Sequence, residues 1–186
     1  ERFVVDQIGE DVGGRLHTGR SRQDVGVTTN RLYLRTRILD IADGLNELRA
    51  ILLKLAHKHK ETVMPCYTWT QHAQPTTFAH YLLSFGYAFA RDFQRISRAF
   101  QETNKSPAGA ALQTGTSYPL NRERTKELMG FDEVIRNTRD AAMNFDYLYE
   151  IMVAASLSIG DLLRLLEDFT IWHSAEFNMI SLDDPW

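Results

Sequence analysis

Long stretches of the chain place apolar residues at alternating intervals of four and three positions, the spacing of one face of a helix. In residues 25–60 this series comprises Leu34, Ile38, Ile41, Leu45, Leu48, Leu52 and Leu55. Polar and charged residues occupy the other positions, which is typical of an a/d heptad seam. Because Pro65 follows, the pattern predicts one long helix that ends before this proline.

Two further stretches show the same spacing. The second begins at Thr76 and Thr77, whose hydroxyls can cap a helix. The third begins near residues 137–138 and reaches Phe169, and a short helix is expected before it over residues 122–129. No strand-like alternation or hairpin signal competes with these helices. The prediction is therefore an all-α fold, a bundle of long helices.

The predicted helices are unusually long and carry apolar residues outside a single stripe. A helix of about 30 residues is roughly 45 Å long at ~1.5 Å per residue, whereas helices of globular proteins average roughly a dozen residues. The additional apolar residues are Tyr33, Ile51, Tyr81, Tyr147, Ile151 and Val153. One three-helix core cannot bury this much apolar surface, so we expect the bundle to self-associate.

The amino-acid composition limits which partners the protein can bind and in which cellular compartment it is expected. The 186 residues are 44% hydrophobic and 24% charged, with a formal net charge of −3, which argues against binding to nucleic acid because a row of phosphates would not be neutralised. The nearly apolar run at residues 151–159 is too short to cross a bilayer. The single cysteine, Cys66, suits a reducing compartment. We expect a cytoplasmic protein that contacts neither nucleic acid nor membrane.

The first of three polar segments, residues 13–24, precedes the first long helix. It combines glycines with arginines at a helix N-terminus, and this arrangement favours an anion such as a carboxylate. The alternative interpretation is a capping loop, in which Ser21 or Thr18 is the N-cap and Arg22 pairs with Asp24. Residue types alone do not decide between these two roles.

Residues 67–78 form the second polar segment and residues 106–120 the third. The second offers hydroxyls, amides and the imidazole of His72, which could orient a substrate and move protons near neutral pH; its alternative role is an interhelical loop with Trp69 packed in the core. The third, rich in Gly, Ser and Thr, could wrap an anion but is also typical of connectors. No P-loop, dinucleotide fingerprint or Cys/His metal spacing is present, so no cofactor or metal is predicted.

Taken together, the segments resemble argininosuccinate lyase, a family of the aspartase/fumarase superfamily. The resemblance rests on LHTGRSRQD at residues 16–24, MPCYTWTQHAQPTTF at residues 64–78 and SPAGAA at residues 106–111, and the order of the long helices fits. It implies a homotetramer with a helical core and active sites built from segments of three subunits. It also implies a small dicarboxylate substrate: argininosuccinate is split into arginine and fumarate by proton abstraction and acid-assisted C–N cleavage.

The resemblance also implies roles for individual residues. The positions at which the family binds substrate carboxylates are Ser21, Arg22, Gln23 and Thr68. Gln23 departs from the family pattern, which has Asn there. Trp69 stands at the family histidine position, and an indole cannot exchange a proton near neutral pH. His72, three residues further on, is the candidate to replace that histidine as the proton carrier.

The resemblance further predicts where this chain lies in the family sequence. Residues 1–24 would form a polar loop and the entry to the central domain, and residues 25–186 the central helical-bundle domain. The family's flexible Gly-Ser-Ser-x-Met-Pro-Gln-Lys loop, to which the catalytic base is assigned, would begin just after Trp186. We therefore expect a central fragment without the N-terminal and C-terminal parts of the parent protein.

Two other functions stay open. One is a lyase that acts on another N-succinyl compound, such as an aminopolycarboxylate or adenylosuccinate. The other is a catalytically silent structural oligomer, as lens crystallins of this family are. Trp69 favours the silent oligomer, whereas Arg22 and Thr68 argue against it because a scaffold does not need carboxylate-binding residues.

Overall fold

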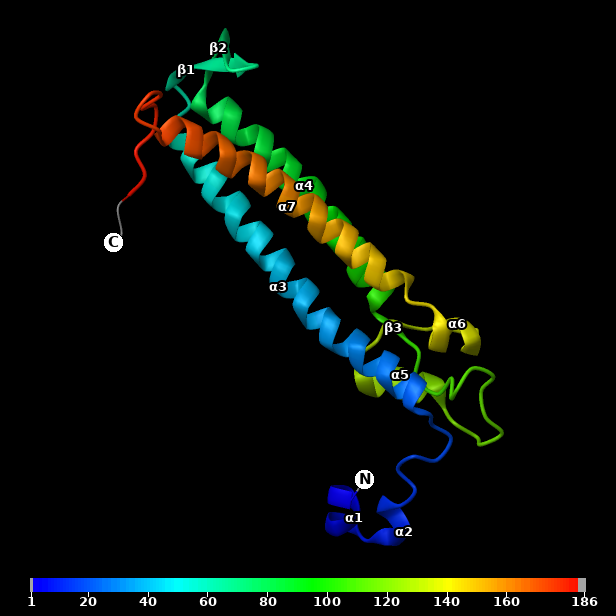
Figure 1. Cartoon of the computed structure of the whole chain (residues 1–186). Helices are drawn as coiled ribbons and strands as arrows, with labels where there is room; N and C mark the ends of the chain where they lie inside the picture. Colours follow the sequence, from blue (N-terminus) through cyan, green and yellow to red (C-terminus); the bar gives the residue numbers. More distant parts are fainter. Residues whose placement is uncertain (1, 184–186) are drawn as a thin grey trace. The chain divides into compact units, whose positions relative to one another are not determined.

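The computed structural model describes residues 2–183, which form long helices joined by short helices and strands (Figure 1). In chain order the elements are α1 (Arg2–Ile8), α2 (Glu10–Gly13), α3 (Arg22–Lys58), β1 (Val63–Thr68), β2 (Gln71–Thr77), α4 (Phe78–Thr103), β3 (Lys105–Ser106), α5 (Arg122–Met129), β4 (Glu133–Val134), α6 (Thr138–Met143) and α7 (Asp146–His173). The predicted helical fold is confirmed. No helix of the described residues combines the length and the apolar character needed to span a bilayer.

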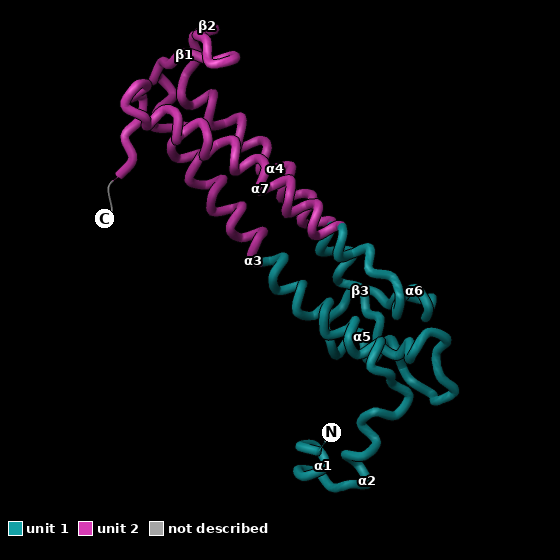
Figure 2. Tube along the Cα trace, in the orientation of Figure 1, with its two compact units in different colours: residues 1–39, 99–149 teal, residues 40–98, 150–186 magenta. Residues whose placement is uncertain are grey.

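The chain divides into two compact units (Figure 2). Unit 1 comprises Glu1–Leu39 and Ala99–Tyr149, and unit 2 comprises Asp40–Arg98 and Glu150–Trp186. The three long helices α3, α4 and α7 each contribute residues to both units.

Helices α3, α4 and α5 confirm the predictions made for these stretches. Helix α3 has 37 residues and begins at Arg22, three positions before the predicted start. Helix α4 begins directly after Thr77, whose hydroxyl accepts a hydrogen bond from the backbone N–H of His80 at 3.2 Å. This contact satisfies one of the free N–H groups of the first helical turn.

The prediction of one continuous helix from residues 137–138 was wrong, because two helices occupy this stretch. The side chain of Asn137 accepts hydrogen bonds from the backbone N–H groups of Arg139 and Asp140, both at 3.0 Å, and so caps the short helix α6. Helix α6 ends at Met143, and Asn144 has an extended backbone. The long helix α7 then begins at Asp146.

The expectation of no strands was also wrong, because residues 63–77 form an antiparallel β-hairpin. Thr68 pairs with Gln71, so the two strands are joined by a two-residue turn at Trp69 and Thr70. Most side chains of β2 are exposed on both faces. The strand therefore lacks the alternation of apolar and polar residues that marks a half-buried strand in a sequence.

The hydrophobic core of unit 1 is small and fully buried. Ala110, Ala141 and Ala142 are buried together, with Ile135 packed against them. Arg31 is buried as well, and its guanidinium donates hydrogen bonds to the last carbonyls of α4, at 2.6 Å to Glu102 and 3.3 Å to Thr103. Its guanidinium carbon also lies 3.8 Å from the centre of the Tyr147 ring. Burial lowers the pKa of Arg31 from its usual value.

Unit 2 is a bundle of three helical segments that run side by side (Figure 2). Leu82, Phe89 and Ile96 of α4 are completely buried. Arg49 of α3 lies over the Phe93 ring. At the hairpin end the core is aromatic and comprises Phe78, Tyr81, Phe85, Phe169 and Trp172. This packing ties the hairpin end of α4 to α7.

Candidate functional site

The first polar segment ends in a capping box at the start of α3. The Ser21 hydroxyl accepts a hydrogen bond from the Gln23 N–H at 2.9 Å, and the Asp24 carboxylate accepts one from the Ser21 N–H at 2.8 Å. These reciprocal contacts satisfy two backbone donors at the helix start. Ser21 is therefore the N-cap, and of the two capping candidates, Ser21 and Thr18, the structure selects Ser21.

Asp24 also joins the first polar segment to the third. Its second carboxylate oxygen accepts hydrogen bonds from the backbone N–H groups of Gly109 and Ala111, both at 3.2 Å. The Ser21 hydroxyl donates to the Ala111 carbonyl at 3.3 Å. Asp24 is only 2% exposed, so these backbone donors take the place of water around a buried carboxylate. Sequence reasoning gave Asp24 no such role, although Ser-x-x-Asp before a helix is a readable signal.

Arg22 is left available for a ligand. The pairing of Arg22 with Asp24, which belonged to the capping-loop alternative, does not occur among the described residues; the Asp24 carboxylate accepts hydrogen bonds from backbone N–H groups instead. Arg22 is exposed, and within residues 2–183 its guanidinium has no hydrogen-bond or ion-pair partner. It is the first residue of a 37-residue helix, where the helix dipole also favours negative charge. An anion that approaches this turn meets the full set of guanidinium donors.

The side-chain amide of Gln23 uses one of its N–H groups in a hydrogen bond within the fold. Its side-chain N–H donates to the Ala142 carbonyl in α6 at 2.8 Å, across 119 positions of sequence. A second N–H of the same amide stays available for a ligand. This contact holds the start of α3 to α6.

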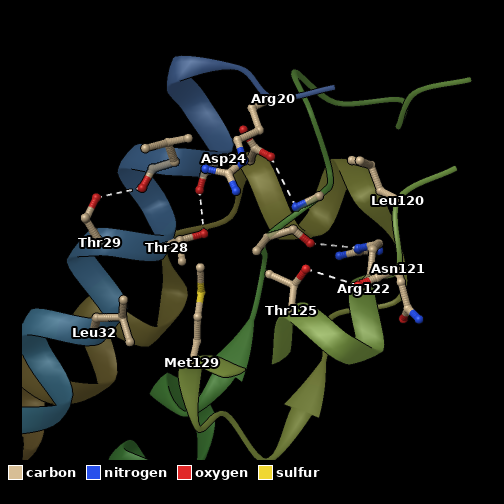
Figure 3. Close-up of a pocket in the computed structure, with 13 residues that line it drawn as sticks. Arg20, Asp24, Thr28, Thr29, Leu32, Leu120, Asn121, Arg122, Thr125 and Met129 are labelled. Carbon is tan, nitrogen blue, oxygen red and sulfur yellow. Dashed lines mark hydrogen bonds between the residues drawn. The ribbon is translucent and has the colours of Figure 1, made fainter. Parts of the chain in front are cut away.

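A pocket of about 170 Å³ opens in unit 1, beside the start of α3 (Figure 3). Thirteen residues line it: Arg20, Asp24, Val25, Thr28, Thr29, Leu32, Ala108, Gly109, Leu120, Asn121, Arg122, Thr125 and Met129. The Arg122 guanidinium is held by the carbonyls of Ala108 at 2.9 Å and Ile135 at 2.8 Å. Burial lowers the pKa of Arg122. Arg122 therefore supports the pocket wall by binding backbone carbonyls.

The second polar segment is the hairpin, and its turn presents Trp69 to solvent. The Trp69 side chain is 96% exposed, so the alternative in which it packs in the core is wrong. Trp69 and Thr70 have φ values of 51° and 59°, which a two-residue turn of this kind normally obtains from Asn-Gly or Gly-Gly. Thr68 precedes the turn and is exposed as well.

His72 lies beside Tyr67 on the paired strand. Its Nε2 is 3.3 Å from the Tyr67 hydroxyl, and the two ring centres are 5.1 Å apart. Tyr67 also contacts Phe177 and Met179 at the end of the described chain. His72 is exposed, and its role as a proton carrier stays a prediction.

The predicted substrate-binding and catalytic residues therefore fall into two groups. Ser21, Arg22 and Gln23 lie together in unit 1, at the start of α3. Thr68, Trp69 and His72 lie in unit 2, on the hairpin. No group of three or more side chains suited to hold a metal ion occurs in the described part of the chain.

Long helices, a polar segment at the start of α3 and a polar hairpin between α3 and α4 characterise this chain. The family model described as Lyase matches residues 2–186, and the chain belongs to this family. It is 47% identical to the argininosuccinate lyase of Methanosarcina barkeri over 186 residues, which is 100% of this chain and 38% of that protein. It is 43% identical to the argininosuccinate lyase of Geobacillus thermodenitrificans, again over 100% of this chain, and 40% of that protein. The resemblance to argininosuccinate lyase is confirmed.

Solved structures agree on the fold. EDDS lyase in complex with formate has a TM-score of 0.93 and 32% identity, over 96% of this chain and 36% of that one. A fumarate lyase from Mesorhizobium sp. BNC1 has a TM-score of 0.79 and 26% identity, over 89% and 39%. The class II fumarase from Schistosoma mansoni, at 17% identity and a TM-score of 0.77 over 90% and 39%, shares the fold. The chain spans about two fifths of the length of the proteins it matches.

Proposed function

We propose that the protein to which this chain belongs is a carbon–nitrogen lyase that eliminates fumarate from an N-substituted aspartate, with argininosuccinate as the substrate and arginine and fumarate as the products. The proposal is supported by the similarity to argininosuccinate lyases over the whole chain. The structural observation that supports it is Arg22, which is exposed at a helix N-terminus and has no partner for its guanidinium within residues 2–183. The nearby carboxylate of Asp24 is bound to backbone N–H groups.

In this proposal the start of α3 binds a substrate carboxylate. A guanidinium matches a carboxylate with two parallel hydrogen bonds, and the helix dipole adds to the attraction. The capping box fixes the backbone from which Arg22 projects. The remaining N–H of Gln23 is the second donor. The Thr68 hydroxyl is proposed as a third donor, contributed by the hairpin of another subunit, because the family resemblance implies active sites built from segments of three subunits. Such donors stabilise the negative charge that builds up on the carboxylate when the adjacent C–H loses its proton.

The elimination also needs a base and an acid. A base removes the proton from the carbon next to the carboxylate, the C–N bond breaks, and the nitrogen takes the electron pair together with a proton. The base would come from the family's flexible serine loop. Trp69 cannot deliver the proton to nitrogen because the indole does not titrate near neutral pH. His72, exposed three residues further on, is the proposed acid.

A second candidate is a lyase for a different N-succinyl compound. Gln23 and Trp69 both depart from the family pattern, and the EDDS lyase has a TM-score of 0.93 to this chain. A changed amide and a changed aromatic ring favour a different group on the aspartate nitrogen. A catalytically silent oligomer is the third possibility, supported by Trp69 and opposed by Arg22 and Thr68.

We further propose that the protein is a homotetramer of the cytoplasm. The helices of unit 2 expose apolar side chains along much of their length, including Ile51, Leu53, Leu83, Met152, Val153, Leu157, Ile159, Leu163 and Leu166. Subunit contacts through these helices would bury this surface. A single cysteine in 186 residues suits a reducing compartment.

The test is fumarate release from the full-length protein, followed by ultraviolet absorbance, with argininosuccinate and EDDS as separate substrates. Turnover of argininosuccinate by the unmodified protein, abolished in His72→Ala, would support His72 as the acid. Activity that appears only in Trp69→His would mean that the indole alone disables an otherwise intact lyase. If neither the unmodified protein nor Trp69→His releases fumarate from either substrate, the proposed function is rejected in favour of a structural oligomer without activity.

A further inference from the structure

Trp69 holds an unusual position for a large apolar residue. It lies at the tip of the hairpin with 96% of its side chain exposed. Both turn residues have positive φ, although neither is glycine and Thr70 is β-branched. Backbone conformations of this kind are unfavourable for such residues and are concentrated at ligand-binding sites. The backbone of the turn is therefore strained, and the indole of Trp69 lies in solvent.

The surroundings of Trp69 suit a polar ligand. Its neighbours Thr68, Thr70 and Gln71 are exposed and carry hydroxyl and amide groups. Residues 63–77 contain no Asp, Glu, Lys or Arg. The fully buried centre of a protein–protein interface is mostly apolar, whereas small-molecule sites combine an aromatic surface with a few hydrogen-bonding groups. The hairpin tip, with one aromatic ring among hydroxyl and amide groups, resembles a small-molecule site in composition.

Tyr67, which pairs with His72 next to the turn, is held in place while Trp69 in the turn stays exposed. Tyr67 packs edge-on to Phe177, with ring centres 5.5 Å apart, and its hydroxyl contacts the Met179 sulfur at 3.5 Å. At the tip, the Thr70 hydroxyl donates to the Trp69 carbonyl at 2.6 Å. An aromatic ring on an anchored hairpin is a rigid surface for stacking.

We propose that Trp69 binds the substituent on the substrate nitrogen and selects for one that is planar and cationic, such as a guanidinium. The indole face attracts a cation through its quadrupole, and no carboxylate of residues 63–77 competes for that cation. Trp69 would thus be a specificity-determining residue that contacts the leaving group. This inference rests on the proposed function, because it names the leaving-group end of that substrate.

The experiment compares two products of matched shape, arginine and citrulline, which differ in that the first carries a cationic guanidinium and the second a neutral urea. Binding of each to the full-length protein, saturated with fumarate, is measured by calorimetry for the unmodified protein, Trp69→Phe and Trp69→Leu. We expect arginine to bind about fivefold more tightly than citrulline. Trp69→Phe should keep part of this preference, and Trp69→Leu should lose it.

An unchanged preference in Trp69→Leu, or no preference in the unmodified protein, would overturn the inference. The binding result separates this inference from the proposed function. A protein that prefers arginine through Trp69 but releases no fumarate would uphold the leaving-group site and reject the lyase. A protein that releases fumarate, but whose preference for arginine does not depend on Trp69, would uphold the lyase and reject the leaving-group site.

Discussion

At the scale of single residues, Arg22 decides whether the start of α3 is a binding site. Arg22→Ala should lower kcat/KM for argininosuccinate by about a hundredfold, because a charge-assisted contact with a carboxylate is lost without a replacement. Steady-state fumarate release measures this. Arg98→Ala is the matched control: Arg98 is an exposed arginine of α4 for which the described residues supply no ion-pair partner. Equal activity of both variants would remove Arg22 from the site.

Gln23 combines two roles that a shorter amide would separate. Gln23→Asn cannot span the same distance to the Ala142 carbonyl, so the free energy of unfolding should fall by about 1 kcal/mol. The same change restores the family residue and frees both amide N–H groups, so kcat/KM for argininosuccinate should rise. Urea denaturation and fumarate release, run on one preparation, check the two effects. A stability loss without a gain in activity would mean that the glutamine is not what limits turnover.

The candidate residues could be predicted from the sequence, but most of their contacts could not. The resemblance to the family motifs singles out Ser21, Arg22 and Thr68, which lie in polar segments between the apolar helices. The contacts of Asp24 with Gly109 and Ala111 cross 85 and 87 positions, and that of Gln23 crosses 119. Local pattern does not record which distant carbonyls or N–H groups will lie nearby. The capping box is the exception, since it is complete within four residues.

At the scale of elements, the hairpin turn carries a conformational cost that can be measured. Thr70→Gly should stabilise the protein by about 1 kcal/mol, because glycine adopts a φ of 59° without the clash of a branched side chain. Thr70→Ala, which keeps a Cβ, should recover much less of this energy. Chemical denaturation of the two variants gives the comparison. Identical stabilities would show that the turn is not strained.

The elements that could be predicted are those whose apolar residues repeat at a helical interval. Helices α3, α4 and α5 follow from this repeat and from caps such as Thr77. The hairpin could not be found in this way, because its exposed faces carry polar residues and its turn lacks glycine. The break between α6 and α7 was missed because apolar residues continue at helical spacing across it. Asn144 provides the local signal of a helix end.

At the scale of the whole molecule, the exposed apolar residues of α7 predict assembly. Leu163→Asp, at a position about half exposed in this chain, should convert the proposed tetramer into smaller species, because a carboxylate cannot be buried unpaired in a subunit contact. Sedimentation velocity of the full-length protein measures the change. Glu150→Gln, a change at an exposed and already polar position of the same helix, should leave the assembly intact. A tetramer that tolerates Leu163→Asp would place the contacts elsewhere.

Asp92 makes the stability of the molecule depend on pH. Its side chain is fully buried in unit 2, and one carboxylate oxygen has no hydrogen-bond partner among the residues that the structure describes. The other oxygen accepts a hydrogen bond from Arg95 at 2.5 Å. Burial raises the pKa of Asp92; the contact with Arg95 opposes this rise, and the charge of Asp161 adds to it.

The direction of the pH effect follows from this raised pKa. Between the ordinary aspartate pKa, about 3.9, and the higher folded value, the folded state holds a proton that the unfolded state has lost. The contribution of Asp92 to stability is therefore greatest below pH ~4 and falls as the pH rises through the folded pKa. An uncharged side chain at this position is free of that penalty.

Asp92→Asn should therefore gain stability relative to the unmodified protein as the pH rises from about 4 to neutral, since the amide does not ionise in the buried site. Urea denaturation of both proteins across this pH range measures the difference between their free energies of unfolding. Asp43→Asn, which changes an exposed aspartate of α3, should run parallel to the unmodified protein. If Asp92→Asn also ran parallel, the Asp92 carboxylate would be ionised to the same extent in the folded and unfolded states, and Arg95 would fully compensate its burial.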